Sequence, residues 1–147
     1  MKVYWLFFLK TILAAVILVA GQSVINYAAA KENAVVVGFQ RDLDEQLLRY
    51  LKNGQAKALV GHFNSSVNLI IEKEEGHYSK FQSELILDDF FRHKKVEDVK
   101  VVQSVAANNG GARYVVYQLK TSQKTYRVFL RMIRVDDEFF MSEVRIE

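Results

Sequence analysis

The sequence predicts an α+β domain in which N-terminal helices pack on a curved antiparallel sheet, preceded by an N-terminal signal segment. Three observations favour this fold class. Apolar residues recur at helical spacing in the first half of the chain, they alternate with other residues in the second half, and short turns separate the alternating segments. Helices grouped first and strands grouped last are typical of α+β folds, whereas a parallel α/β sheet interleaves the two.

The first 30 residues have the composition of a secretory signal peptide. Lys2 and Lys10 flank a first apolar run, an uncharged run continues over Thr11–Ile25, and Ala28-Ala-Ala30 supplies the small residues that a signal peptidase recognises. An uncleaved membrane anchor is the alternative, although this run is short of the roughly 20 residues that span a bilayer. We therefore expect an exported protein, periplasmic or secreted, that touches the membrane only through this segment if it stays uncleaved.

Residues 31–147 contain no linker, repeat or low-complexity stretch, which predicts a single domain. A helix is predicted over residues 33–52, because apolar side chains recur there every three or four positions, and Asn53-Gly54 has the residue types of a C-cap. A second, short helix follows, with Ala58 and Leu59 on its buried side and His62-Phe63 as further candidates for that side. After a turn, the run Val67–Ile71 has the composition of a strand.

A third helix is predicted to begin after Ser79, which stands three residues before Gln82 as in a capping box. The helix ends in the basic run Arg92–Lys95, where positive charge suits the helix dipole. Within it, Leu87 and Phe91 lie four residues apart and are predicted to pack against the sheet. The polar residues before this helix, up to His77, are predicted to form a connection.

Four further strands are predicted at the end of the chain: Val99–Ala106, Arg113–Thr121, Thr125–Val135 and Phe139–Ile146. The turns between them are short enough for antiparallel hairpins. In the strand from Thr125, apolar residues alternate with Arg127, Phe129 and Arg131. The sheet is therefore expected to bury one face and to expose a mixed apolar and charged face.

This order of elements resembles the nuclear-transport-factor-2-like, or cystatin-like, α+β cone. Over residues 47–147 the chain is also similar to a family of uncharacterised exported bacterial domains with that fold. The stretches that carry this resemblance are Gly54–Leu59, His62-Phe63, Tyr78–Gln82, Leu87–Phe91, Tyr126–Val128 and Glu143–Ile146. The resemblance implies a fold; because the family has no assigned activity, it implies no catalytic or binding residue.

Charge and composition exclude several classes of function. The formal charge of +3 includes Lys2 and Lys10, so the residues after the signal segment hold 18 basic and 17 acidic side chains. A nucleic-acid-binding domain would keep a clustered basic excess, which argues against that class. Cysteine is absent, which excludes disulfides, thiol nucleophiles and cysteine-ligated metals. The histidines are too widely spaced for a helical metal site, so neither metal nor cofactor is predicted.

No catalytic constellation emerges from the sequence. Asp88 and Asp89 are adjacent carboxylates, but neighbouring side chains on a helix diverge by about 100°. The cone fold nevertheless hosts both enzymes and binding modules. A small cone-fold isomerase or hydrolase with a single acid–base residue therefore stays open as the alternative to a non-enzymatic domain.

Aromatic residues concentrate in the third helix and the sheet, where they either pack in the core or line a binding surface. Arginines beside aromatics on the outer sheet face suit a partner contact, or else a solvated surface. We expect a non-enzymatic domain that binds a protein partner or a second copy through its sheet, or else a small apolar ligand. The candidate binding residues are Tyr78, Tyr117, Tyr126, Arg127, Phe129 and Arg131.

Overall fold

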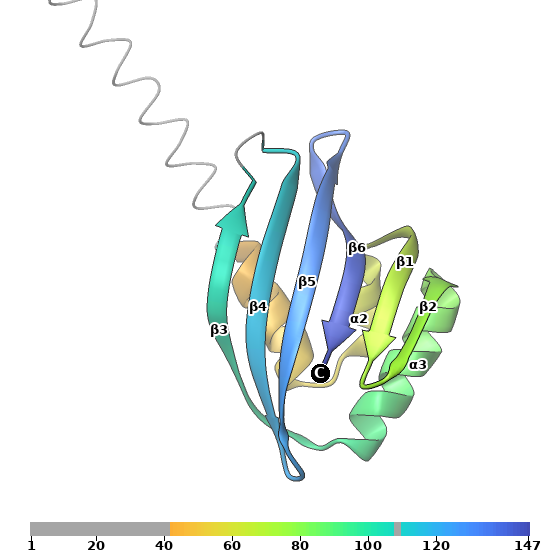
Figure 1. The fold of residues 1–147 in the computed structure, drawn as a ribbon, viewed down its shortest axis with the longest axis vertical. Coiled ribbons are helices and arrows are strands. Elements are labelled where there is room, and N and C mark those ends of the chain that lie inside the picture. Colours follow the sequence, from red (N-terminus) through yellow and green to blue (C-terminus); the bar gives the residue numbers. More distant parts are fainter. Residues whose placement is uncertain (1–41, 108–109) are drawn as a thin grey trace, which may run out of the picture. The chain divides into compact units, whose positions relative to one another are not determined.

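Six strands form a single sheet in the computed structural model, which describes residues 42–107 and 110–147 (Figure 1). The strand order is β2-β1-β6-β5-β4-β3. The strands are β1 (Phe63–Ile71), β2 (Glu74–Ser79), β3 (Val96–Ala106), β4 (Ala112–Thr121), β5 (Thr125–Val135) and β6 (Glu138–Ile146). The predicted signal segment and the first part of the helix predicted over 33–52 lie outside the described residues.

Helices cover one face of this sheet (Figure 1). Residues 42–52 are helical, α2 spans Ala56–Gly61 and α3 spans Lys80–His93. The predicted capping box of α3 is confirmed, because Ser79 Oγ accepts from the Gln82 amide and the Gln82 side chain accepts from the Ser79 amide. Gly54 has a φ of +61°, the left-handed conformation expected of a residue that ends a helix.

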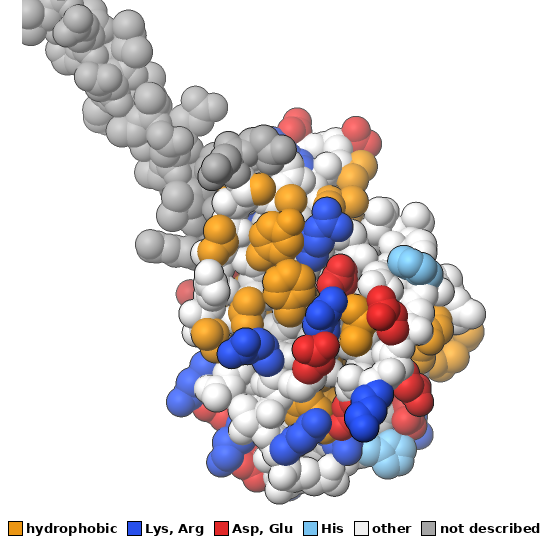
Figure 2. Space-filling view, viewed as in Figure 1, with side chains coloured by type: hydrophobic (Ala, Val, Ile, Leu, Met, Phe, Trp, Pro, Cys, Tyr) orange, Lys and Arg blue, Asp and Glu red, His pale blue; other side chains and the backbone are white. Residues whose placement is uncertain are grey.

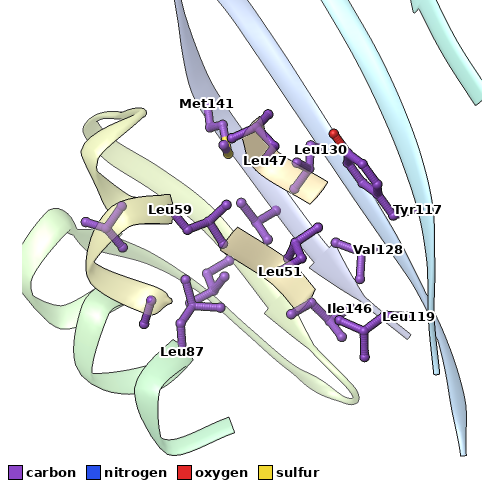
Figure 3. Close-up of a cluster of buried hydrophobic side chains, with 14 of the residues drawn as sticks. Leu47, Leu51, Leu59, Leu87, Tyr117, Leu119, Val128, Leu130, Met141 and Ile146 are labelled. Carbon is purple, nitrogen blue, oxygen red and sulfur yellow. The ribbon is translucent and has the colours of Figure 1, made fainter. Parts of the chain in front are cut away.

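The core lies between the helices and the inner face of the sheet (Figure 3). Leu47 and Leu51 project from the helix over 42–52, and Leu87 projects from α3. They meet side chains such as Leu130 and Met141, whose strands alternate buried and exposed positions. This alternation confirms the predicted α+β fold with one buried sheet face.

Three predicted features differ from the structure. The turn predicted before Val67–Ile71 and Phe63, which was predicted with the second helix, both belong to β1, which begins at Phe63. The polar residues up to His77, predicted as a connection, mostly belong to β2, which pairs only with β1. Their side chains are largely exposed, so they show no apolar alternation that could reveal a strand. In α3 it is Phe90 that is buried, at 6% exposure, whereas Phe91 is only half-buried.

The sheet is mixed and open. Strands β3 to β6 form the predicted antiparallel hairpins, but β1 pairs with β6 in parallel. Strands β2 and β3 are therefore the two edges. Along β3 the register with β4 shifts between Val96 and Asp98 and again between Val101 and Gln103. Among the described residues, no helix has the length and apolarity needed to cross a membrane.

Candidate functional site

The predicted binding residues fall on opposite faces of the sheet. Tyr117 and Tyr126 point into the core and are 0% and 1% exposed. Arg127, Phe129 and Arg131 alternate with buried residues along β5 and lie on its outer face. Because Tyr126 and Arg127 are neighbours on one strand, their side chains must point to opposite faces. The six predicted residues therefore do not form one site.

Tyr78, the remaining predicted residue, lies near the end of β2 and packs half-buried against the core. Its ring stands so close to Gly76 that a Cβ on that glycine would come within 2.7 Å of the Tyr78 ring and hydroxyl. The glycine therefore makes room for the tyrosine, which fills space beneath the edge strand. Tyr78 is far along the sheet from β5, with β1 and β6 between them.

A buried ion pair near Tyr117 is a feature that the sequence analysis missed. The Asp44 carboxylate accepts from the Arg113 guanidinium, which also donates to Ser104 Oγ over 2.9 Å. The Tyr117 hydroxyl donates to the main-chain oxygen of Asp44 over 3.1 Å. Burial raises the pKa of Asp44, an effect that the Arg113 charge opposes. Arg113 occupies an inward-facing position of β4, two and four residues before the buried Val115 and Tyr117. This alternation is the feature of the sequence that could have predicted a buried arginine.

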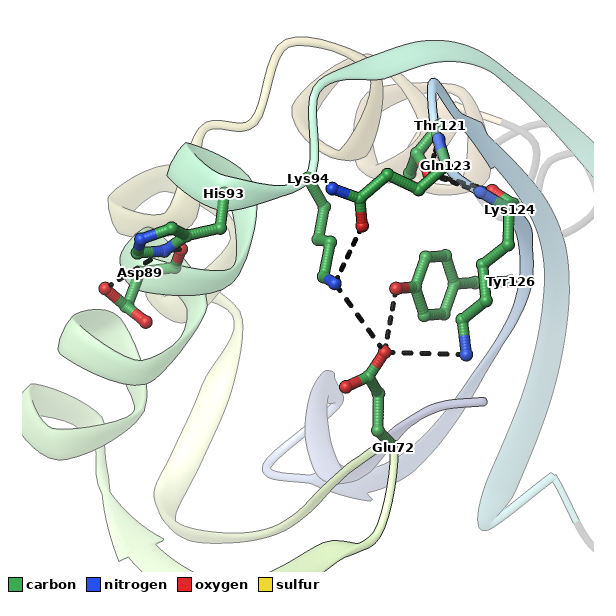
Figure 4. A network of polar contacts seen from close by, with 8 residues as sticks. All are labelled: Glu72, Asp89, His93, Lys94, Thr121, Gln123, Lys124 and Tyr126. Atoms are coloured by element: carbon green, nitrogen blue, oxygen red, sulfur yellow. Dashed lines mark hydrogen bonds and ion pairs between the residues drawn. The ribbon is translucent and has the colours of Figure 1, made fainter.

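Tyr126 belongs to a second polar network, at the end of the core near the β1–β2 and β4–β5 turns (Figure 4). Its hydroxyl donates to Glu72 Oε1 over 2.8 Å, and Lys124 and Lys94 approach the same oxygen to 3.4 and 3.9 Å. The hydrogen bond from Tyr126, followed by the lysine charges, lowers the pKa of Glu72. Burial, together with the contact with Glu72, raises the pKa of Tyr126 to about 12. Glu72 adopts a φ of +55°, a conformation uncommon outside glycine.

A groove of about 980 Å³ runs beside this network. Its apolar lining comes from Ile71, Ile86 and Phe90, and its charged lining holds lysines and carboxylates in similar number. Lys94 and Lys124 both already form ion pairs with the Glu72 carboxylate. The groove therefore offers no excess of either charge with which to select a ligand.

The sheet-face patch is the third feature, which we define as Arg127, Phe129, Arg131, Glu143, Arg145 and Glu147. These six side chains line a hollow of about 380 Å³ on the outer face of β5 and β6. Cross-strand pairing explains their proximity: Phe129 stands opposite Arg145, and Arg131 stands opposite Glu143. In Figure 2, apolar side chains gather on one side of this face, and basic and acidic side chains mix on the other.

Within the sheet-face patch, the arginines differ in how they are paired. Arg145 lies 3.3 Å from Glu143 and 3.7 Å from Glu147. In contrast, the side chains of Arg127 and Arg131 form no hydrogen bond or ion pair within the part of the chain that the structure describes. Beside them, the rings of Phe129 and Tyr114 lie 5.8 Å apart between centroids. The patch thus joins two guanidinium groups without a partner in the described part of the chain to an aromatic pair, and both arginine and aromatic residues are enriched in protein interfaces.

Comparisons with known proteins agree with the fold. Among solved structures, a DUF4783 family protein from Bacteroides uniformis is 23% identical, with a TM-score of 0.66 over 70% of this chain and 94% of that one. One from Bacteroides ovatus is 20% identical, with a TM-score of 0.64 over 69% and 90%. A cystatin-like domain of unknown function from Nostoc punctiforme is 10% identical, with a TM-score of 0.58 over 74% of each chain.

These likenesses, all under 25% identity, concern the fold alone. No curated protein sequence matches the chain. The model of the family described as a domain of unknown function, DUF4783, matches residues 45–147, which include every strand and both α2 and α3. The cystatin-like resemblance expected from the sequence is therefore confirmed, and the chain belongs to the DUF4783 family.

Proposed function

We propose that this chain is an exported, non-enzymatic domain that binds a protein partner through the sheet-face patch. The observation that carries the proposal is the pair of guanidinium groups of Arg127 and Arg131, which have no partner among the described residues and lie on either side of Phe129 in one hollow. Arginine and aromatic side chains are enriched among the residues that dominate binding energy at interfaces. An unpaired guanidinium also offers a partner up to five hydrogen-bond donors without first breaking an internal contact.

The inner face gives less support to the two other functions weighed from the sequence. A small apolar ligand would need an open aromatic pocket, but Tyr117 and Tyr126 are buried and their hydroxyls are hydrogen-bonded. A cone-fold enzyme would need an acid–base residue facing a cavity. Asp44 is the buried carboxylate that best fits that role, yet its charge is paired with Arg113 and it lines neither the groove nor the patch.

Photo-crosslinking of the full chain in the cells that express it tests the proposed surface. Tyr114→p-benzoylphenylalanine puts a reactive aromatic group next to Phe129, and we expect irradiation to yield a discrete covalent adduct of higher mass. Lys57→p-benzoylphenylalanine is the matched control, because Lys57 is exposed on α2, on the helix-covered side. Adducts that are absent at position 114, or equally strong at both positions, would contradict binding through the patch.

Export is the second part of the proposal. It is supported by the basic start, the uncharged apolar run and the small residues Ala28-Ala-Ala30 of the sequence. Mass spectrometry of the protein recovered from the cells that express it is expected to find a mature N-terminus at or near Lys31. Recovery of the intact chain from the membrane fraction would instead identify the segment as an anchor.

A further inference from the structure

The charge pattern of the sheet-face patch indicates which partner it fits. We propose that the partner is a second copy of this chain, and that two copies meet patch to patch across a twofold axis that runs parallel to the strands, between β5 and β6. This inference rests on the proposed function, because it names the partner of the same surface.

The patch is built of three level rows, each holding one residue of β5 and one residue of β6 or, in one row, Glu147 directly after it. Arg131 is level with Glu143, and Phe129 is level with Arg145. Arg127 is level with Glu147, since these two residues exchange main-chain hydrogen bonds of 2.7 and 3.0 Å. The two outer rows therefore carry a cation on β5 and a carboxylate on or directly after β6, and the middle row carries an aromatic ring and a cation.

A half-turn about an axis parallel to the strands keeps every row level and exchanges β5 with β6. Arg131 of each copy then faces Glu143 of the other, and Arg127 faces Glu147. In the middle row, Phe129 faces Arg145, an arrangement that suits a cation–π contact. Every row is thus complementary to itself, as an isologous interface requires.

Other symmetric arrangements of the same two faces bring like charges together. With the axis on β5 itself, Arg127 of one molecule would face Arg127 of the other, and Arg131 would face Arg131. With the axis across the strands, at the row of Phe129, Arg131 would face Arg127 and Glu143 would face Glu147. Like charges held opposite each other oppose association. The pattern of charges therefore selects the axis between β5 and β6.

The twist of the sheets is compatible with this pairing. Aligned sheets pack with their strands about 30° apart. Neighbouring rows are two residues apart, about 7 Å along the strand. Such a crossing displaces each outer row sideways by about half that spacing, a distance within the reach of an arginine side chain. Within residues 42–107 and 110–147 no internal contact of the Arg127 or Arg131 side chain would have to break for that reach.

Exchange of charges between two versions of the chain tests this pairing. The full chain is purified in mild detergent throughout, and its association is followed by sedimentation velocity. We expect wild type to form a two-copy species. Arg131→Glu alone and Glu143→Arg alone should each weaken it at least tenfold, because each change turns both contacts of a row repulsive. An equal mixture of the two variants should recover association to within a few-fold of wild type, because each new glutamate then faces a new arginine.

Recovery in the mixture, but in neither variant alone, is specific to a contact between copies. Arg92→Glu, on the exposed side of α3, is the matched charge reversal and should leave association unchanged. Circular dichroism checks the fold of each variant, and the pair Arg127→Glu with Glu147→Arg repeats the test if either variant misfolds. Association that survives Arg131→Glu, or a mixture that does not recover, would overturn the pairing.

The result also separates this inference from the proposed function. A wild-type chain that stays single at all concentrations would overturn self-association. If the adduct at position 114 then contained a different protein, binding through the patch would stand with another partner. If no adduct formed there either, both the inference and the proposed function would fall.

Discussion

Asp44→Ala is expected to lower the free energy of unfolding by about 3–5 kcal/mol, because it leaves the Arg113 guanidinium buried without its carboxylate. The side chains of the pair are only 11% and 3% exposed, so the substitution removes the adjacent counter-charge from a guanidinium that bulk water barely reaches. The Ser104 hydroxyl and the Tyr117 hydroxyl keep their contacts in this region, and neither is negatively charged. Chemical denaturation followed by circular dichroism measures the loss.

Two further variants test the cause. Glu45→Ala changes the next residue of the same helix, which is exposed, and should alter stability by no more than about 0.5 kcal/mol. Asp44→Leu combined with Arg113→Met removes both charges and should regain much of the loss, because apolar side chains of similar volume often replace a buried pair well. If Asp44→Ala lowers the free energy of unfolding by less than about 1 kcal/mol, this pair does not hold the helix over residues 42–52 to the sheet.

Phe90→Ala should also cost about 3–5 kcal/mol, because it empties a site that the ring fills between α3 and the sheet. Phe90 is 6% exposed and makes edge-on contacts with Tyr126 and Phe91, at centroid distances of 5.3 and 5.5 Å. The same denaturation measurement applies. Aromatic contacts of this geometry add to the burial of the ring itself.

The same helix supplies the control for this prediction. Phe81 is 70% exposed, so Phe81→Ala removes an identical side chain with little change in buried area. We expect its effect to stay within about 0.5 kcal/mol. Equal losses at positions 81 and 90 would contradict the prediction, because alanine has the higher helix propensity at both positions and packing against the sheet distinguishes only Phe90.

The elements that sequence analysis predicted best depend on short-range signals. The capping box at Ser79 and the alternation along β5 are both local, and both appear in the structure. The parallel pairing of β1 with β6 joins residues that are distant in the sequence, such as Asn68 and Glu143. No pattern within either strand encodes such a neighbour. The edge strand β2 was missed for a different reason, since exposed polar residues satisfy either a strand or a loop.

For the candidate site, the residues were easier to predict than their grouping. The sequence placed Arg127, Phe129 and Arg131 together on one face, and the structure brings them into one hollow. The same alternation shows that Tyr126 cannot join them, because it precedes Arg127 directly. Asp44 could not be foreseen as a buried residue, because its partner Arg113 lies 69 residues further along the chain.

The shifts of register along β3 have a consequence for how far association can proceed. A regular exposed edge invites another strand, and repeated addition of strands leads to fibres. The bulges of β3 bend its edge away from the flat geometry that such addition needs. The other edge, β2, is only 6 residues long and exposes Glu74 and Glu75. Growth at the edges is therefore disfavoured, and the face-to-face pairing proposed above would end with two copies, because it covers the patch of each.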